Sequence, residues 1–173
     1  MDLTQLANLG EFIGGVAVLV TLVYLATQVR QNTRAVSAAT FHAISSETSG
    51  FVARVAENPE LAALLEKGFL RPDELSPSER FRVGFWLRAT FRLNENYFYQ
   101  TDYYGVLDSG VGAGYTSSLS EHARIPFVRE WWGTAKGAFS PSFQAHFDGV
   151  LESTEPSETS FTRNMTAPDV PTA

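Results

Sequence analysis

Four residues in the second half of the chain have side chains suited to binding a small molecule: Arg88, Arg92, Glu95 and Tyr99. Spacings of four and three place the two arginines and the glutamate on one face of a helix. Phe and Tyr residues surround them in the sequence. A charged cluster between aromatic rings could bind an anionic or aromatic ligand, but such clusters are more often structural ion pairs or stacked arginines. Both interpretations stay open.

No catalytic or metal-binding pattern accompanies this cluster. His42, His122 and His146 are far apart, and none belongs to an HxxxH or ExxH pattern. The chain has no cysteine, no GxSxG and no phosphate-binding loop. The run GVGAG, residues 110–114, follows no predicted strand, so we interpret it as a turn and not as a dinucleotide-binding loop. We predict no catalytic residue, no metal site and no cofactor, and expect a protein without enzymatic activity.

Charge excludes one class of partner. The 173 residues carry a formal net charge of −6. Proteins that bind nucleic acids normally present a basic face and an excess of Lys and Arg. We therefore expect no nucleic-acid partner.

The elements that position these side chains begin with an apolar stretch near the N-terminus. Residues 12–29 contain no formal charge, and ten of them are Phe, Ile, Leu or Val. A bilayer span needs roughly 17 to 25 residues. We interpret residues 1–36 as a transmembrane anchor helix with its span at about 12–29. A core helix of a soluble bundle is the alternative, and a cleaved signal peptide is disfavoured because residues 1–11 contain no Lys or Arg.

Flanking charges give the anchor a direction. Asp2 and Glu11 precede the apolar stretch, whereas Arg30 and Arg34 follow it. The positive-inside rule then puts the N-terminus outside and the remainder of the chain in the cytoplasm. The expected location is the inner membrane of a bacterium, with the lipid bilayer as the first partner.

The candidate helix-packing residues lie at the N-terminal end of the span. Gly10 and Gly14 form a small-xxx-small pair that lets another helix approach closely. Glu11, between them, is a carboxylate at the membrane boundary, where it either reaches the headgroups or takes part in an interhelical contact. We interpret Gly10, Glu11 and Gly14 as the site for a membrane-protein partner or a second copy of the chain.

The rest of the sequence predicts an all-α fold. Helical periodicity continues to about residue 57, although a break near Ser45 and Ser46 stays open. Helix starts are expected at Asn58-Pro59, Ser76-Pro77, Pro126 and Ser140-Pro141, with Gly68 and Gly105 as helix ends and a Gly-rich turn before a short helix near residue 124. We predict a helical cytoplasmic domain at 37–151 and a disordered tail at 152–173, which is rich in Ser, Thr, Glu and Pro.

The helix that begins at Ser76 carries most of the expected core. One side of it has the apolar residues Val83, Trp86, Leu87, Phe91, Phe98 and Tyr104. Further along the chain, Trp131 and Trp132 are adjacent, so one is expected in the core and the other at its edge.

The stretch LGEFIGGVAVLVTLVYLATQVRQNTRAV resembles the N-terminus of an uncharacterised family of bacterial single-pass membrane proteins, and RATFRLNENYFYQ and FSPSFQAHFDGVL extend the likeness over residues 3–151. The resemblance implies a bacterial, membrane-anchored, helical protein. It implies no activity and no catalytic residue.

Three functions follow as hypotheses. The first is a membrane-anchored interaction protein, non-enzymatic, acting as a subunit, adaptor or assembly factor of a membrane complex. The alternative is a ligand-binding or sensory module that uses the cluster around Arg88. The third is a soluble helical-bundle protein or an enzyme of unrecognised type.

Overall fold

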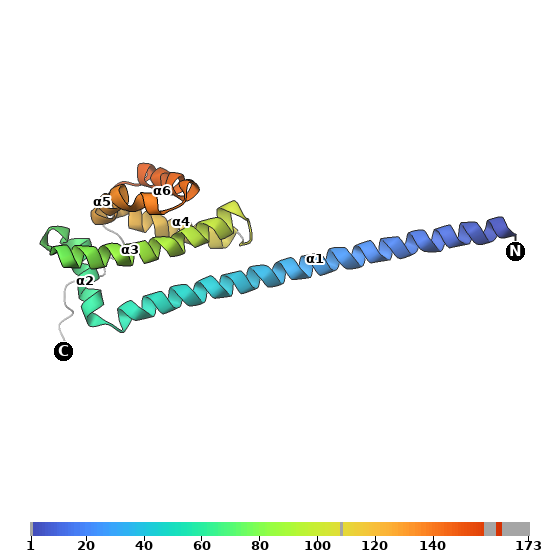
Figure 1. Cartoon of the computed structure of the whole chain (residues 1–173), viewed down its shortest axis with the longest axis horizontal. Helices are drawn as coiled ribbons and strands as arrows, with labels where there is room; N and C mark the ends of the chain where they lie inside the picture. Colours follow the sequence, from blue (N-terminus) through green and yellow to red (C-terminus); the bar gives the residue numbers. More distant parts are fainter. Residues whose placement is uncertain (1, 108, 158–161, 164–173) are drawn as a thin grey trace. The chain divides into compact units, whose positions relative to one another are not determined.

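The computed structural model describes residues 2–107, 109–157 and 162–163, without the side chains of residues 109 and 111–113. Throughout these residues the regular structure is helical, with no strand, as the all-α prediction requires (Figure 1). The α-helices in this described part are α1 (Leu3–Ala56), α2 (Pro59–Leu70), α3 (Pro77–Phe98), α4 (Ser109–Arg124), α5 (Pro126–Ala135) and α6 (Pro141–Ser153). Three short segments join them: η1 (Pro72–Glu74), the π-helix η2 (Tyr99–Tyr103) and η3 (Lys136–Ala138).

The chain divides into two compact units, Met1–His42 and Ala43–Ala173, and α1 contributes to both. The helix has no break at Ser45 or Ser46, so the prediction of one helix to about residue 57 is confirmed. The predicted boundary at residue 36 lies inside this helix. The first unit contains only the N-terminal part of α1, and the second contains its last turns with α2–α6.

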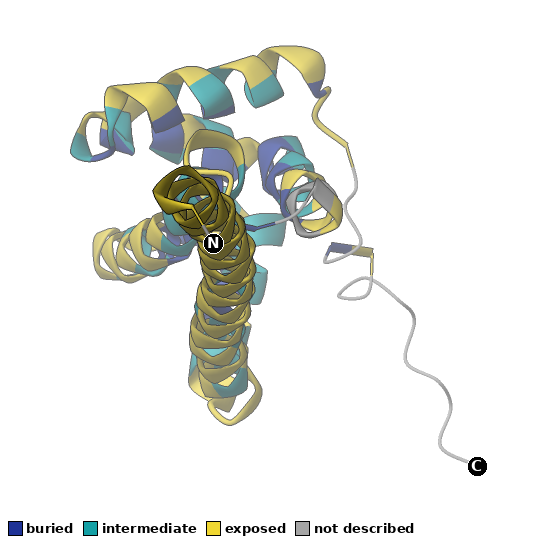
Figure 2. Cartoon of the chain, turned by 90° about the vertical axis from the view of Figure 1, so that its right-hand side faces the viewer, coloured by how far each residue is buried: buried dark blue, intermediate teal, exposed yellow. Residues whose placement is uncertain are grey.

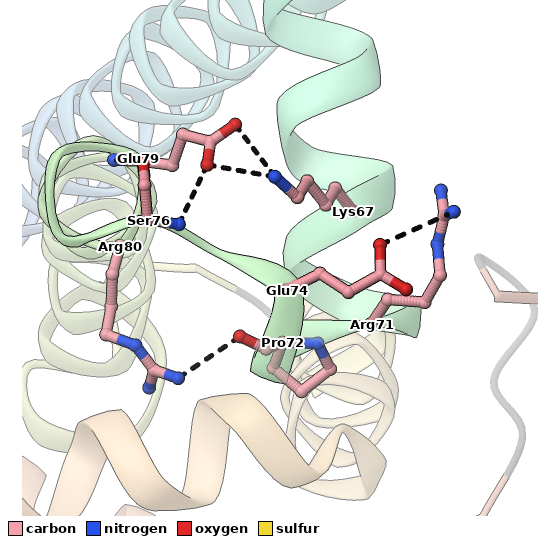
Figure 3. Close-up of polar contacts among 7 residues, drawn as sticks. All are labelled: Lys67, Arg71, Pro72, Glu74, Ser76, Glu79 and Arg80. Atoms are coloured by element: carbon pink, nitrogen blue, oxygen red, sulfur yellow. Dashed lines mark hydrogen bonds and ion pairs between the residues drawn. The ribbon is translucent and has the colours of Figure 1, made fainter.

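Side-chain caps begin three of the helices, as predicted. Asn58 Oδ1 accepts a hydrogen bond from Leu61 N at 3.0 Å at the start of α2, and a proline follows the cap. Ser76 and Glu79 form a reciprocal capping box at the start of α3 (Figure 3). These caps satisfy backbone N–H groups that have no partner within the helix. Ser140 does the same for α6.

Gly68 does not end α2, contrary to the prediction, since the helix continues to Leu70. A Cβ atom at Gly68 would lie 3.2 Å from Val83 Cγ1. The glycine therefore allows α2 and α3 to pack closely, and it sits inside the helix for that reason. Gly105 does lie where the chain leaves η2, with φ of +60°, a conformation that favours glycine.

The GVGAG run is helical, and its interpretation as a turn was wrong. α4 begins at Ser109 and therefore includes residues 110–114. Each glycine costs a helix roughly 1 kcal/mol relative to alanine. Tertiary packing offsets this cost, because Tyr115, Leu119 and Ala123 are buried on one side of the same helix.

The core of the second unit is aromatic and centred on Phe91. Its ring lies 4.8 Å from Phe147 and 5.3 Å from Trp132, centroid to centroid. Figure 2 shows the buried residues within the helical bundle, whereas the N-terminal part of α1 is exposed along nearly its whole length. Trp132 is buried and Trp131 half-buried, which confirms the prediction of one core and one edge indole.

Four of the six predicted core residues of α3 and its continuation are buried: Val83, Leu87, Phe91 and Phe98. Trp86 is half-buried and packs on Phe51 at 5.2 Å. Tyr104 is 63% exposed, so its prediction was wrong. The helix changes to π geometry after Phe98, with Tyr104 N bonded to Tyr99 O, and this shifts later residues out of phase.

The predicted tail falls mostly outside the described residues, at 158–161 and 164–173. Before that point α6 runs two residues beyond the predicted end of the domain at 151. The chain then remains in contact with the bundle: Arg129 donates to Thr154 O, and Arg124 Nη1 donates to Ser157 Oγ at 2.7 Å.

Candidate functional site

One helix in the described part of the chain, α1, is long and apolar enough to span a bilayer. Its large apolar residues are spread over all sides of the helix between residues 12 and 25: Phe12, Ile13, Val16, Val18, Leu19, Val20, Leu22, Val23 and Leu25 are all exposed. A helix docked on a soluble core has one apolar stripe and an opposite polar face. The distribution in α1 is instead that of a helix with an apolar environment on all sides.

The hydroxyl groups within this stretch have acceptors in the helix itself. Thr21 Oγ1 donates to Ala17 O at 2.8 Å, and Thr27 Oγ1 donates to Val23 O at 2.7 Å. In hydrocarbon an unsatisfied polar group costs several kcal/mol, so such internal bonds reduce the cost of insertion. At the C-terminal end of the stretch, Gln28 Nε2 donates to Tyr24 Oη at 3.3 Å, which suits a membrane interface.

The predicted helix-packing residues lie at the other end of the stretch. Apart from the neighbouring residues and the nearby backbone of α1 itself, no described atom comes within 4 Å of a Cβ built on Gly10 or Gly14. Ala17 and Thr21 continue the same face at spacings of three and four. Glu11 is exposed and forms no ion pair with any described residue. Gly10, Gly14, Ala17 and Thr21 thus form a strip of small side chains along one side of α1.

The predicted cluster of Arg88, Arg92, Glu95 and Tyr99 lies on α3 and the start of η2, and it divides into two parts. Arg92 Nη1 donates to Glu95 Oε2, and Arg92 also donates to Ala138 O and lies 4.8 Å above the Phe139 ring. Glu95 is buried, and its Oε1 accepts Ser140 N at 2.8 Å. Burial alone would raise the pKa of Glu95, but the hydrogen bonds from Ser140 and Arg92 outweigh it and the pKa is lowered. The pair joins α3 to the segment that starts α6.

Arg88 and Tyr99 do not join this pair. Arg88 is exposed, with its guanidinium carbon 5.7 Å from the centroid of Phe85. Tyr99 is half-buried and packs against the ring of Phe98 at 5.3 Å. Because both carboxylate oxygens of Glu95 are occupied, the cluster offers a ligand little beyond the exposed guanidinium of Arg88.

A second polar group inside the bundle was not predicted. His146 of α6 stacks on Tyr115 of α4 at 6.0 Å, and its Nδ1 lies 4.0 Å from Asp102 Oδ2 in η2. Burial lowers the pKa of His146, against the opposing charge of Asp102. Burial, followed by the charges of Asp102 and Glu95, raises the pKa of Tyr115. These residues come from three elements, so no spacing in the sequence could reveal them.

Two buried polar atoms of this group lack a hydrogen-bond partner within the described part of the chain. Neither Tyr115 Oη nor His146 Nε2 has a hydrogen-bond partner among the described residues. The other histidines lie apart from this pair: His122 is buried with Nδ1 2.8 Å from Ser118 O, and His42 is exposed. Within the described residues, no three His, Asp or Glu side chains lie close enough to hold a metal ion.

Comparison of the chain with protein-family models, with curated proteins and with solved structures finds no match. Two features of the described residues bear on function: the exposed apolar stretch of α1 and the helical bundle of the second unit.

Proposed function

We propose that this chain is a single-pass membrane protein that acts without catalysis as a subunit, adaptor or assembly factor of a membrane complex. One observation carries the proposal: the apolar stretch of α1 is exposed on every side, and its threonine hydroxyls are satisfied within the helix. So much exposed apolar surface needs a bilayer or a partner to cover it. About ten large apolar side chains contribute roughly −3 to −6 kcal/mol to insertion.

The charge pattern supports one direction of insertion. Arg30 and Arg34 follow the stretch, whereas Asp2 and Glu11 precede it. We therefore assign the N-terminus to the outside and the helical bundle to the cytoplasm, in the inner membrane of a bacterium. The resemblance to bacterial single-pass membrane proteins agrees with this location.

In this proposal the partner is recognised through Gly10, Glu11 and Gly14. The open backbone at the two glycines permits a close helix crossing, with a membrane protein or with a second copy of the chain. Glu11 lies one residue from Gly10 at the boundary of the span, where a polar contact to the partner costs least.

A matched pair of phenylalanine substitutions tests this face. Gly14→Phe places a large side chain on the packing face, whereas Val16→Phe places the same side chain about 200° round the helix, on the opposite side. After extraction in mild detergent, we expect the complex to be lost in Gly14→Phe and retained in Val16→Phe. A strictly monomeric wild-type chain with no associated protein, or equal behaviour of the two variants, would contradict the proposed packing face.

The ligand-binding alternative has less support. Arg92 and Glu95 are bonded to each other and to the backbone of Ala138 and Ser140, so their polar groups are used in holding the bundle together. We therefore assign this pair a structural role.

A further inference from the structure

The outward face of α3 carries an aromatic pair that the bundle does not use. Phe81 and Phe85 are 66% and 57% exposed, with ring centroids 4.6 Å apart. Arg88 is one turn further along, stacked on Phe85, and Arg82 is exposed beside them. Spacings of four and three put Phe81, Phe85 and Arg88 in one line. We call these four residues the α3 outer face.

This face is positively charged in an acidic protein. The chain has a formal net charge of −6, yet neither Arg82 nor Arg88 forms an ion pair with a described residue. Both carboxylates of α3 are occupied elsewhere. Glu79 accepts Lys67 Nζ at 2.9 Å and Ser76 N at 2.8 Å (Figure 3), and Glu95 is bonded to Arg92.

The fold does not require these side chains. The opposite side of α3 supplies the core residues Val83, Leu87 and Phe91, which are fully buried. Contiguous exposed apolar surface rimmed by polar residues marks interaction sites on many proteins. Aromatic residues and arginine are also the types most enriched at the energetic centres of protein interfaces.

We propose that the α3 outer face binds an acidic amphipathic segment of a partner protein. Apolar side chains of that segment cover Phe81 and Phe85, and its Asp or Glu side chains pair with Arg82 and Arg88. The planar guanidinium group binds a carboxylate through two hydrogen bonds, and Arg88 is already ordered by its contact with Phe85. This inference goes beyond the proposed membrane anchor, because it concerns a different helix and does not depend on where the chain resides.

Charge and shape favour an acidic protein over the other occupants. Two copies of the α3 outer face would bring four unpaired guanidinium groups together, which opposes a symmetric self-association. A helix that lies on a bilayer buries an apolar face along its length. The α3 outer face has only two apolar rings, and the longer apolar side of α3 is in the core.

Site-specific photocrosslinking in native membranes tests this proposal on the full chain. A benzophenone amino acid replaces Phe85, and in a matched control it replaces Val52, which is 60% exposed on α1. The crosslinked peptides are then identified by mass spectrometry. We expect position 85, and not position 52, to crosslink to a segment of another protein that has apolar residues flanked by Asp or Glu.

Charge reversal gives the second arm of the same experiment. The double variant Arg82→Glu/Arg88→Glu should lower the yield at position 85 by at least about tenfold, since attraction becomes repulsion. Arg71→Glu, at an exposed arginine outside the face, should leave the yield unchanged. Equal far-UV circular dichroism and thermal midpoints of the variants establish that the bundle is intact.

Several results would overturn the proposal. They are a crosslink to lipid alone, to a second copy alone, to a protein segment without carboxylates, or to nothing. Charge reversal without effect on the yield would do the same. Each of these leaves the assignment of α1 as an anchor intact, because the anchor is tested by membrane extraction.

Discussion

Glu95 Oε1 accepts the backbone N–H of Ser140 at 2.8 Å, so a buried carboxylate of α3 holds the residue that caps α6. Arg92 pairs with the other carboxylate oxygen and reaches the backbone of Ala138. The first turn of α6 is thus fixed to the middle of the bundle by polar contacts as well as by its Phe side chains. This relationship explains why a buried glutamate and its arginine lie on a helix that packs against an aromatic core.

Replacing Glu95 by Gln should destabilise the bundle by about 1–3 kcal/mol, because the charge-assisted bonds to Ser140 and Arg92 are weakened at a buried site. Unfolding of the full chain in detergent by urea, followed by circular dichroism, measures this. Glu152→Gln, at an exposed site on α6, is the control and should change the stability by less than about 0.5 kcal/mol. Equal changes in stability for the two substitutions would contradict the structural role assigned to Glu95.

Stability should decrease as the pH falls below about 6.5, the ordinary pKa of histidine. Burial lowers the pKa of both His122 and His146, so the unfolded chain binds protons that the folded chain does not. The stabilisation by these neutral side chains is complete above pH 6.5 and is lost as the pH falls through the lowered values.

Thermal midpoints at pH 7.5 and pH 5.5 measure this dependence. His146→Phe keeps an aromatic ring beside Tyr115 but cannot titrate, and it should reduce the difference between the two midpoints. If His146→Phe leaves the pH dependence unchanged, His146 is not one of the groups responsible.

Trp132→Phe should cost more stability than Trp131→Phe. Trp132 is buried, and its Nε1 donates to Asp148 Oδ1 at 2.8 Å, whereas no described residue accepts from the half-buried Trp131 indole. The lost volume and hydrogen bond should amount to about 1–3 kcal/mol. Hydrogen bonds from Lys136 and then Trp132 lower the pKa of Asp148, so this pKa should rise in Trp132→Phe, as NMR titration would detect. An unchanged pKa would contradict the assigned hydrogen bond.

Two glycine substitutions should have opposite signs. Gly105→Ala places a side chain at φ of +60° and should destabilise by about 1 kcal/mol. Gly149→Ala, on the exposed side of α6 with no atom within 4 Å of its Cβ, should stabilise by up to about 1 kcal/mol. The denaturant midpoint of each variant is compared with that of the wild-type chain. Midpoint shifts of the same sign in both variants would contradict this prediction.

Local signals in the sequence predicted the helix starts well. Asn58, Ser76 and Ser140, each followed by proline, cap helices as expected, because a cap depends only on neighbouring residues. The failures have causes that helical periodicity does not register. GVGAG is helical because the residues after it pack into the core, and Tyr104 is exposed because the helix changes to π geometry.

The candidate site was predictable only in part. The exposed apolar stretch and the open face at Gly10 and Gly14 follow from composition and spacing. The bond from Ser140 to Glu95 joins residues 45 positions apart, and His146 meets Asp102 and Tyr115 from separate elements. Helical periodicity in the sequence does not encode these contacts, because they depend on how the helices pack against one another.

Cysteine labelling tests the central claim most directly, because the chain contains no cysteine of its own. Single cysteines are introduced at Thr4, before the span, and at Ser142, an exposed position in α6. A membrane-impermeant maleimide is then added to intact cells and to lysed cells, and membranes are extracted with alkaline carbonate. We expect the chain to remain in the membrane, Thr4→Cys to react in intact cells, and Ser142→Cys to react only after lysis. Release of the chain by carbonate, or equal protection of both cysteines in intact cells, would contradict an anchor with its N-terminus outside.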